Sequence, residues 1–112
     1  GGNGSGQAPA EKLTILEIVK DGENGVDGLA GAPDVAVASD GENVYVAAYA
    51  DDALAVFDRD TDTGALSYST LFEDGVAGVD GLAGACGVTV SADGENVYAT
   101  GVNENTLVVF DR

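Results

Sequence analysis

Aspartate and glycine recur together in two short stretches of this sequence, and these residues are the best suited to chemistry. DGENGVDG begins at Asp21 and DGVAGVDG begins at Asp74. Each stretch places two carboxylates six residues apart, Asp21 with Asp27 and Asp74 with Asp80. Carboxylates and the backbone carbonyls of a glycine-rich turn are oxygen ligands that calcium prefers, so these four residues are candidate metal ligands. The alternative, which we favour, is that aspartate and glycine only satisfy the backbone of the loops.

A further series, Asp58, Asp60 and Asp62 followed by Gly64, has part of the spacing of a calcium loop. An EF-hand loop requires glycine at its sixth position and a bidentate glutamate at its twelfth. Here glycine is seventh and Ser69 is twelfth. A hairpin turn is therefore the favoured interpretation of this series.

The sequence contains no evident catalytic group. It has 0 histidines, and its single cysteine, Cys86, has no basic neighbour in the sequence that would favour a reactive thiolate. We expect a buried structural thiol there. An acidic chain also places carboxylates in pairs at random, so no pair indicates a glycosidase site. We therefore expect no enzyme activity and no catalytic residue.

The charge of the chain excludes several partners. Its 112 residues include 4 Lys and Arg against 20 Asp and Glu, a net charge of −16. Nucleic acids and anionic membranes attract basic surfaces, so we expect neither as a partner. Such acidity is typical of a soluble protein, for example a secreted or salt-adapted one. Residues 1–6, GGNGSG, are predicted to be a flexible linker or an expression remnant, and we expect no signal peptide here because a basic and an apolar region are missing.

The elements that position these residues come from a repeat. Residues 25–59 align with residues 78–112 at a constant offset of 53, with 21 identities in 35 positions. A repeat of this length with several short strands is typical of a β-propeller or a solenoid.

Eight strands are predicted, and all links except the glycine-rich ones are hairpin-short, so neighbouring strands should pair antiparallel. Four antiparallel strands per period make one propeller blade. The predicted fold class is all-β, with residues 7–112 forming a two-blade propeller unit. Residues 25–77 are its first full repeat, and residues 78–112 are three strands of the second. The predicted strands are residues 13–19, 35–38, 44–50, 54–58, 66–72, 88–91, 97–101 and 107–111.

These residues resemble a known family. VYVAA at 44–48, VYATG at 97–101, the two DGENVY turns and the ALAVFDRDTDTGAL hairpin are similar to lactonase-like, YVTN-type β-propeller repeats. The resemblance covers residues 13–112 and implies a propeller fold, commonly with seven blades. This chain departs from the family pattern in having two blades' worth of strands and no histidine. The resemblance therefore implies the fold and no catalytic residue.

The two ends of the sequence are predicted to complete one blade between two copies. Residues 7–112 span two periods of 53, and residues 13–19 match the outer strand at 66–72. This outer strand would pair with the third strand, residues 107–111, of another copy, head to tail; unpaired, it would be an exposed apolar edge. Two-blade units close only rings of even blade number, so we expect six blades from a homotrimer or eight from a homotetramer. The alternative architecture is a compact eight-stranded sandwich from one chain.

The function expected from the sequence is that of a non-enzymatic, self-assembling propeller unit, serving as a structural or protein-interaction scaffold. No cofactor is expected. One alternative is a propeller that binds calcium or a small ligand in the central channel of the ring. A second alternative is a remnant of a lactonase-like enzyme.

Overall fold

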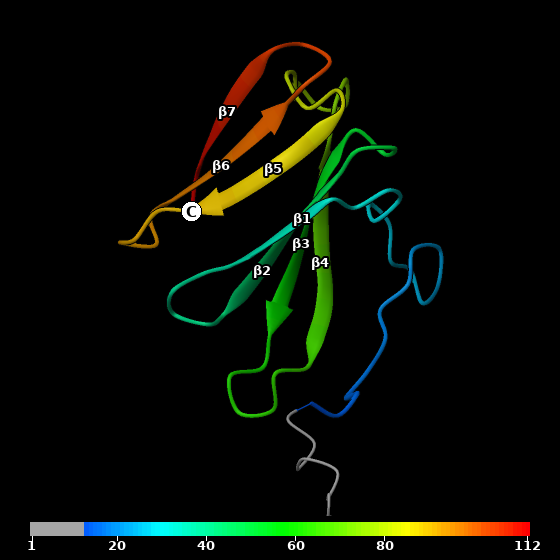
Figure 1. The fold of residues 1–112 in the computed structure, drawn as a ribbon, viewed down its shortest axis with the longest axis vertical. Helices are drawn as coiled ribbons and strands as arrows, with labels where there is room; N and C mark the ends of the chain where they lie inside the picture. Colours follow the sequence, from blue (N-terminus) through cyan, green and yellow to red (C-terminus); the bar gives the residue numbers. More distant parts are fainter. Residues whose placement is uncertain (1–12) are drawn as a thin grey trace, which may run out of the picture.

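The computed structural model describes residues 13–112, which form two antiparallel sheets (Figure 1). The first sheet has the strand order β1-β2-β3-β4 and the second has the order β5-β6-β7. In this part of the chain no helix is present that could span a membrane. The strands are β1 (Asp34–Val37), β2 (Asn43–Ala48), β3 (Ala53–Arg59), β4 (Leu66–Glu73), β5 (Ala85–Val90), β6 (Asn96–Gly101) and β7 (Thr106–Asp111).

Seven of the predicted strands are confirmed, with boundaries that differ by at most three residues. Short polar turns set these boundaries. In the turn between β1 and β2, Asp40 accepts a hydrogen bond from the Glu42 N–H (2.9 Å) and Gly41 has a φ of 75°, a conformation that costs glycine little. The turn between β5 and β6 repeats this arrangement at Asp93 and Gly94.

The repeat in the sequence is also a repeat in the structure. Val44 of β2 pairs with Phe57 of β3, and 53 residues later Val97 of β6 pairs with Phe110 of β7. The two sheets therefore have the same order and register over their common strands, as expected for consecutive propeller blades. This supports the predicted all-β, blade-like fold class.

The main core lies between the two sheets. Small residues dominate where the sheets approach each other, because β5 packs closely against β1 and β2. The buried members of this core are Ala38, Tyr45, Ala47, Leu54, Leu82, Ala85, Val88, Val97 and Ala99. A second, smaller cluster around Phe57 lies on the opposite face of the first sheet.

The predicted strand at residues 13–19 is not formed in the single chain. A strand needs a neighbour for its backbone groups, and the place beside β3 is already occupied by β4. Leu13, Ile15 and Ile18 are exposed, whereas Val19 packs against the Phe57 cluster. The predicted linker at residues 1–6 lies outside the described residues.

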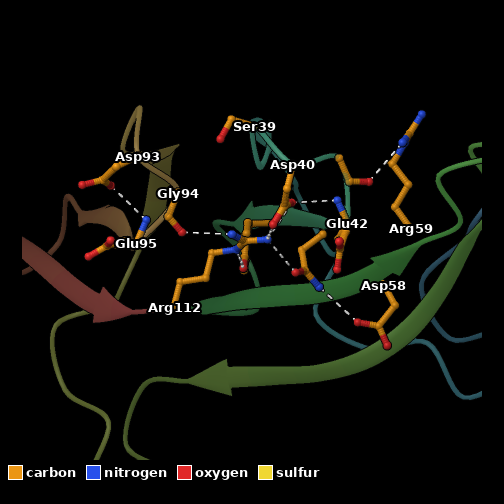
Figure 2. Close-up of polar contacts among 12 residues, drawn as sticks. Ser39, Asp40, Glu42, Asp58, Arg59, Asp93, Gly94, Glu95 and Arg112 are labelled. Carbon is orange, nitrogen blue, oxygen red and sulfur yellow. Dashed lines mark hydrogen bonds and ion pairs between the residues drawn. The ribbon is translucent and has the colours of Figure 1, made fainter.

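One arginine ties the second sheet to the first (Figure 2). Arg112 follows β7; its Nε donates to the Tyr45 hydroxyl (2.8 Å), and its Nη2 donates to both carboxylate oxygens of Asp40 and to Asn43 Oδ1 (2.9 Å each). Its Nη1 donates to the carbonyl oxygen of Gly94 in its own sheet (2.9 Å). We call these contacts the Arg112 clamp.

The electrostatics of the clamp favour the charged forms of both partners. The Glu42 N–H and the Arg112 guanidinium hold the pKa of Asp40 below its usual value. The hydrogen bond to Asp40 in turn raises the pKa of Arg112. The ion pair therefore persists through neutral pH.

Candidate functional site

The two glycine-rich loops that precede β1 and β5 fold in the same way. The Gly22 N–H donates to the Val26 carbonyl (2.9 Å), and the Gly75 N–H donates to the Val79 carbonyl at the matching position (2.8 Å). Glycines with positive φ allow these tight turns in both loops. The loops thus present their carboxylates in equivalent positions.

Each loop brings its two predicted carboxylates together with a third acid. Asp21 and Asp27 lie with Asp51, and their carboxylate oxygens are within 4.8 Å of one another. Asp74 and Asp80 lie with Glu104 within the same distance. These are two candidate cation sites, one per repeat.

The third acid of each cluster was not predicted. Asp51 comes from the turn between β2 and β3, and Glu104 comes from the turn between β6 and β7. The two residues are 53 positions apart. The sequence signal that could have identified them is that both repeats have an acidic residue at this position.

Most of these carboxylates also accept backbone hydrogen bonds from the loops. Asp21 accepts from the Leu29 N–H (3.1 Å) and Asp51 accepts from the Ala30 N–H (3.0 Å). In the second loop, Asp74 accepts from the N–H groups of Gly81 and Leu82 (2.9 and 3.1 Å). The favoured interpretation, that aspartate satisfies the loop backbone, therefore describes a role that these residues fill.

The second cluster shows the repulsion expected of gathered carboxylates. The Ala83 N–H lowers the pKa of Glu104, but the loss of some contact with water and the nearby Asp80 and Asp74 outweigh it, so the pKa of Glu104 lies above its usual value. A divalent cation between the three carboxylates would relieve this repulsion, because it favours their charged forms.

Two other candidates from the sequence, Asp60 and Cys86, lie outside the carboxylate clusters. Asp60 Oδ1 accepts from the N–H groups of Asp62 and Thr63 (2.8 and 3.1 Å), which lowers the pKa of Asp60 and forms the predicted hairpin turn. Cys86 lies at an irregularity in the pairing of β5 with β6 and is half-buried, less buried than expected. The cause is the bulge, which takes its side chain out of the regular alternation.

Comparison with known proteins identifies the family. Residues 6–75 match the family model described as "Lactonase, 7-bladed beta-propeller". This match covers more than half of the 112 residues, so the chain belongs to this family, and the resemblance found in the sequence is confirmed. No curated protein matches the chain.

Proposed function

We propose that this chain is a non-enzymatic propeller scaffold whose two-blade units join head to tail with copies of themselves. The observation that supports this most is a difference in exposure between equivalent repeat positions. Apolar residues that are exposed on the two outer faces of the chain have counterparts in the other repeat that are buried between its two sheets. The head face is the outer face of the first sheet, carrying Val35 and Val37. The tail face is the outer face of the second sheet, carrying Leu107 and Val109.

The head face carries the counterparts of residues buried between the sheets. Val35 is 59% exposed, whereas its repeat counterpart Val88 is 7% exposed because it packs against the first sheet. Val37 is likewise exposed, whereas Val90 packs against the core between the sheets. The head face is thus built to contact another blade.

The tail face shows the same relation. Leu107 is 63% exposed, whereas its counterpart Leu54 is 1% exposed in the core between the sheets. Val109 is exposed, whereas Val56 packs against that core. Fully burying one such side chain contributes about 1.5–3 kcal/mol, so stacking a tail face on a head face would be favourable.

The segment before the first loop supports exchange of an outer strand. Val19 packs against the Phe57 cluster, and its counterpart Phe72 of β4 contacts Phe110, with ring centroids 5.2 Å apart. The segment around Val19 therefore has the same position relative to the first sheet as β4, the outer strand of the first sheet, has relative to the second sheet. A second copy stacked on the head face would bring its β7 beside them, and β7 pairs only with β6 among residues 13–112.

Such contacts are heterologous and form either a closed ring or a filament. A ring of two-blade units has six blades as a homotrimer or eight as a homotetramer, which differs from the seven blades in the family description. The absence of histidine from the sequence supports a scaffold rather than an enzyme. Calcium binding at the two carboxylate clusters is the second candidate function, favoured by their matching geometry.

The test blocks one face at a time. Val35→Arg places a charge on the head face and Val109→Arg places one on the tail face; both sites are more than half exposed, so the fold should tolerate them. Each variant alone should be monomeric, because burying an unpaired charge is costly. An equimolar mixture should form a 1:1 heterodimer through the one intact pair of faces, as measured by sedimentation velocity and native mass spectrometry.

Other outcomes would contradict the proposal. A monomeric wild-type chain at high concentration would exclude self-association. If Val35→Arg became monomeric while Val109→Arg assembled like the wild type, the contact would be head to head instead.

A further inference from the structure

The Arg112 clamp has a counterpart in the first repeat, where the equivalent arginine makes only one of the corresponding hydrogen bonds. Arg59 stands at the repeat position of Arg112, and its Nη1 donates to the Gly41 carbonyl (3.0 Å) as Arg112 Nη1 donates to that of Gly94. Within residues 13–112 the Arg59 side chain makes no other hydrogen bond, and Figure 2 shows its guanidinium pointing away from the clamp. Arg59 thus has donors at Nε and Nη2 to offer.

The matching acceptors are in the second repeat. Asp93, Asn96 and Tyr98 are the counterparts of Asp40, Asn43 and Tyr45 at the offset of 53. Asn96 Nδ2 binds the Phe110 carbonyl (3.2 Å), as Asn43 Nδ2 binds that of Phe57 (3.3 Å), which orients the two amides alike.

No arginine or lysine side chain binds these acceptors in the described part of the chain. Asp93 Oδ1 accepts from the Ser91 hydroxyl and the Glu95 N–H, whereas its Oδ2 has no donor among residues 13–112. The Tyr98 hydroxyl and Asn96 Oδ1 have no hydrogen-bond partner among these residues either. Tyr98 is half-buried, whereas Tyr45, under the Arg112 clamp, is buried.

We infer that Arg59 of one copy binds Asp93, Asn96 and Tyr98 of a second copy and forms a clamp between chains. This inference rests on the proposed head-to-tail association. Stacking a head face on a tail face repeats the relation between the two sheets of one chain. Arg59 then lies against the next copy's second sheet as Arg112 lies against the first sheet. An open depression of about 460 Å³ beside Arg59, also lined by Glu42 and Asp58, leaves room for this approach.

The clamp would also give the contact its direction. The chain has only 4 basic residues against 20 acidic ones, and two of the four are Arg59 and Arg112. Two acidic surfaces repel unless a cation meets a carboxylate, so Arg59 on the head side and Asp93 on the tail side favour head-to-tail over like-to-like contact.

The heterodimer of Val35→Arg and Val109→Arg isolates a single interface and provides the test. In it, Arg59 of the Val109→Arg chain faces Tyr98 of the Val35→Arg chain. Arg59→Met in the Val109→Arg chain should raise the Kd about tenfold or more, because arginine anchors often dominate interfaces. Tyr98→Phe in the Val35→Arg chain should raise it about threefold or more, since it removes one acceptor. Combined, they should weaken binding less than the product of the two effects, because they remove the same contact.

The matched controls are the same substitutions placed in the opposite chains. Arg59→Met in the Val35→Arg chain and Tyr98→Phe in the Val109→Arg chain lie at blocked faces and should leave the Kd unchanged. A heterodimer that forms but does not respond to Arg59→Met would overturn the clamp and leave the scaffold proposal standing. If no heterodimer forms, both the scaffold proposal and the clamp are wrong.

Discussion

At the scale of residues, carboxylates in this protein act mainly by holding backbone N–H groups and one arginine. Asp60 and Asp74 each accept two backbone hydrogen bonds, and Asp40 joins one backbone N–H to Arg112. The ion pair of the Arg112 clamp contributes little by itself, because water reaches the Asp40 carboxylate and screens its charge. Its larger effect is geometric, because four groups orient one planar guanidinium.

Calcium binding can be tested at the same scale. Asp27→Asn combined with Asp80→Asn keeps an acceptor oxygen at each site and removes one charge from each cluster. If the clusters bind calcium, the wild type should melt at a higher temperature in calcium than in chelator, and the double variant should lose that difference.

The control for this experiment removes two charges elsewhere. Asp62→Asn with Glu95→Gln changes two exposed acids outside the clusters and should keep the full calcium response. Equal melting temperatures of the wild type in calcium and in chelator would leave the carboxylates with their role in the loops alone.

At the scale of elements, a strand exists only where a neighbour accepts its backbone groups. Residues 66–73 and 13–19 occupy matching repeat positions, yet only the former is a strand, because β3 lies beside it. The sequence of residues 13–19 is apolar enough for a strand, and all of its side chains except that of Val19 remain exposed. The partner, and not the local sequence, decides this element.

Proline substitution tests whether residues 13–19 form a strand in the proposed assembly. Consecutive N–H groups of a strand point to opposite edges, so Ile15→Pro with Leu16→Pro removes one N–H that would face β7 of another copy. The melting temperature of the monomeric Val109→Arg background should not change, whereas assembly of the otherwise wild-type chain should be lost. Ile15→Val with Leu16→Val, which keeps both N–H groups, is the control and should assemble. Assembly of the proline variant with wild-type affinity would exclude strand exchange.

At the scale of the whole molecule, charge should oppose the proposed assembly and the exposed apolar faces should favour it. Three or four chains of −16 each bring together 48 to 64 negative charges. Salt screens this repulsion, since the Debye length falls from about 10 Å at 0.1 M to about 3 Å at 1 M. Stacked apolar faces and backbone pairing lose little stability in salt, and the ion pair of Arg59 with Asp93 is only one part of the proposed contact.

Assembly should therefore strengthen as salt rises and weaken at low ionic strength near neutral pH. Sedimentation velocity across a sodium chloride series measures this directly, and a series in a neutral osmolyte controls for viscosity and crowding. A particle that dissociates on addition of salt would mean that ion pairs, rather than apolar faces, hold the copies together.

The sequence by itself determined the repeat, the strands and the loops of this protein. Alternating apolar residues and turns such as Asp40-Gly41 act over a few residues, so seven strands and both carboxylate pairs could be read from it. The tertiary structure alone decided which apolar residues are covered, since Leu54 and Leu107 have the same local context and opposite exposure. It also decided the contact of Arg112 with Asp40, which lie 72 positions apart, and the third acid of each cluster. Such contacts depend on how two sheets stack, and no local pattern carries that information.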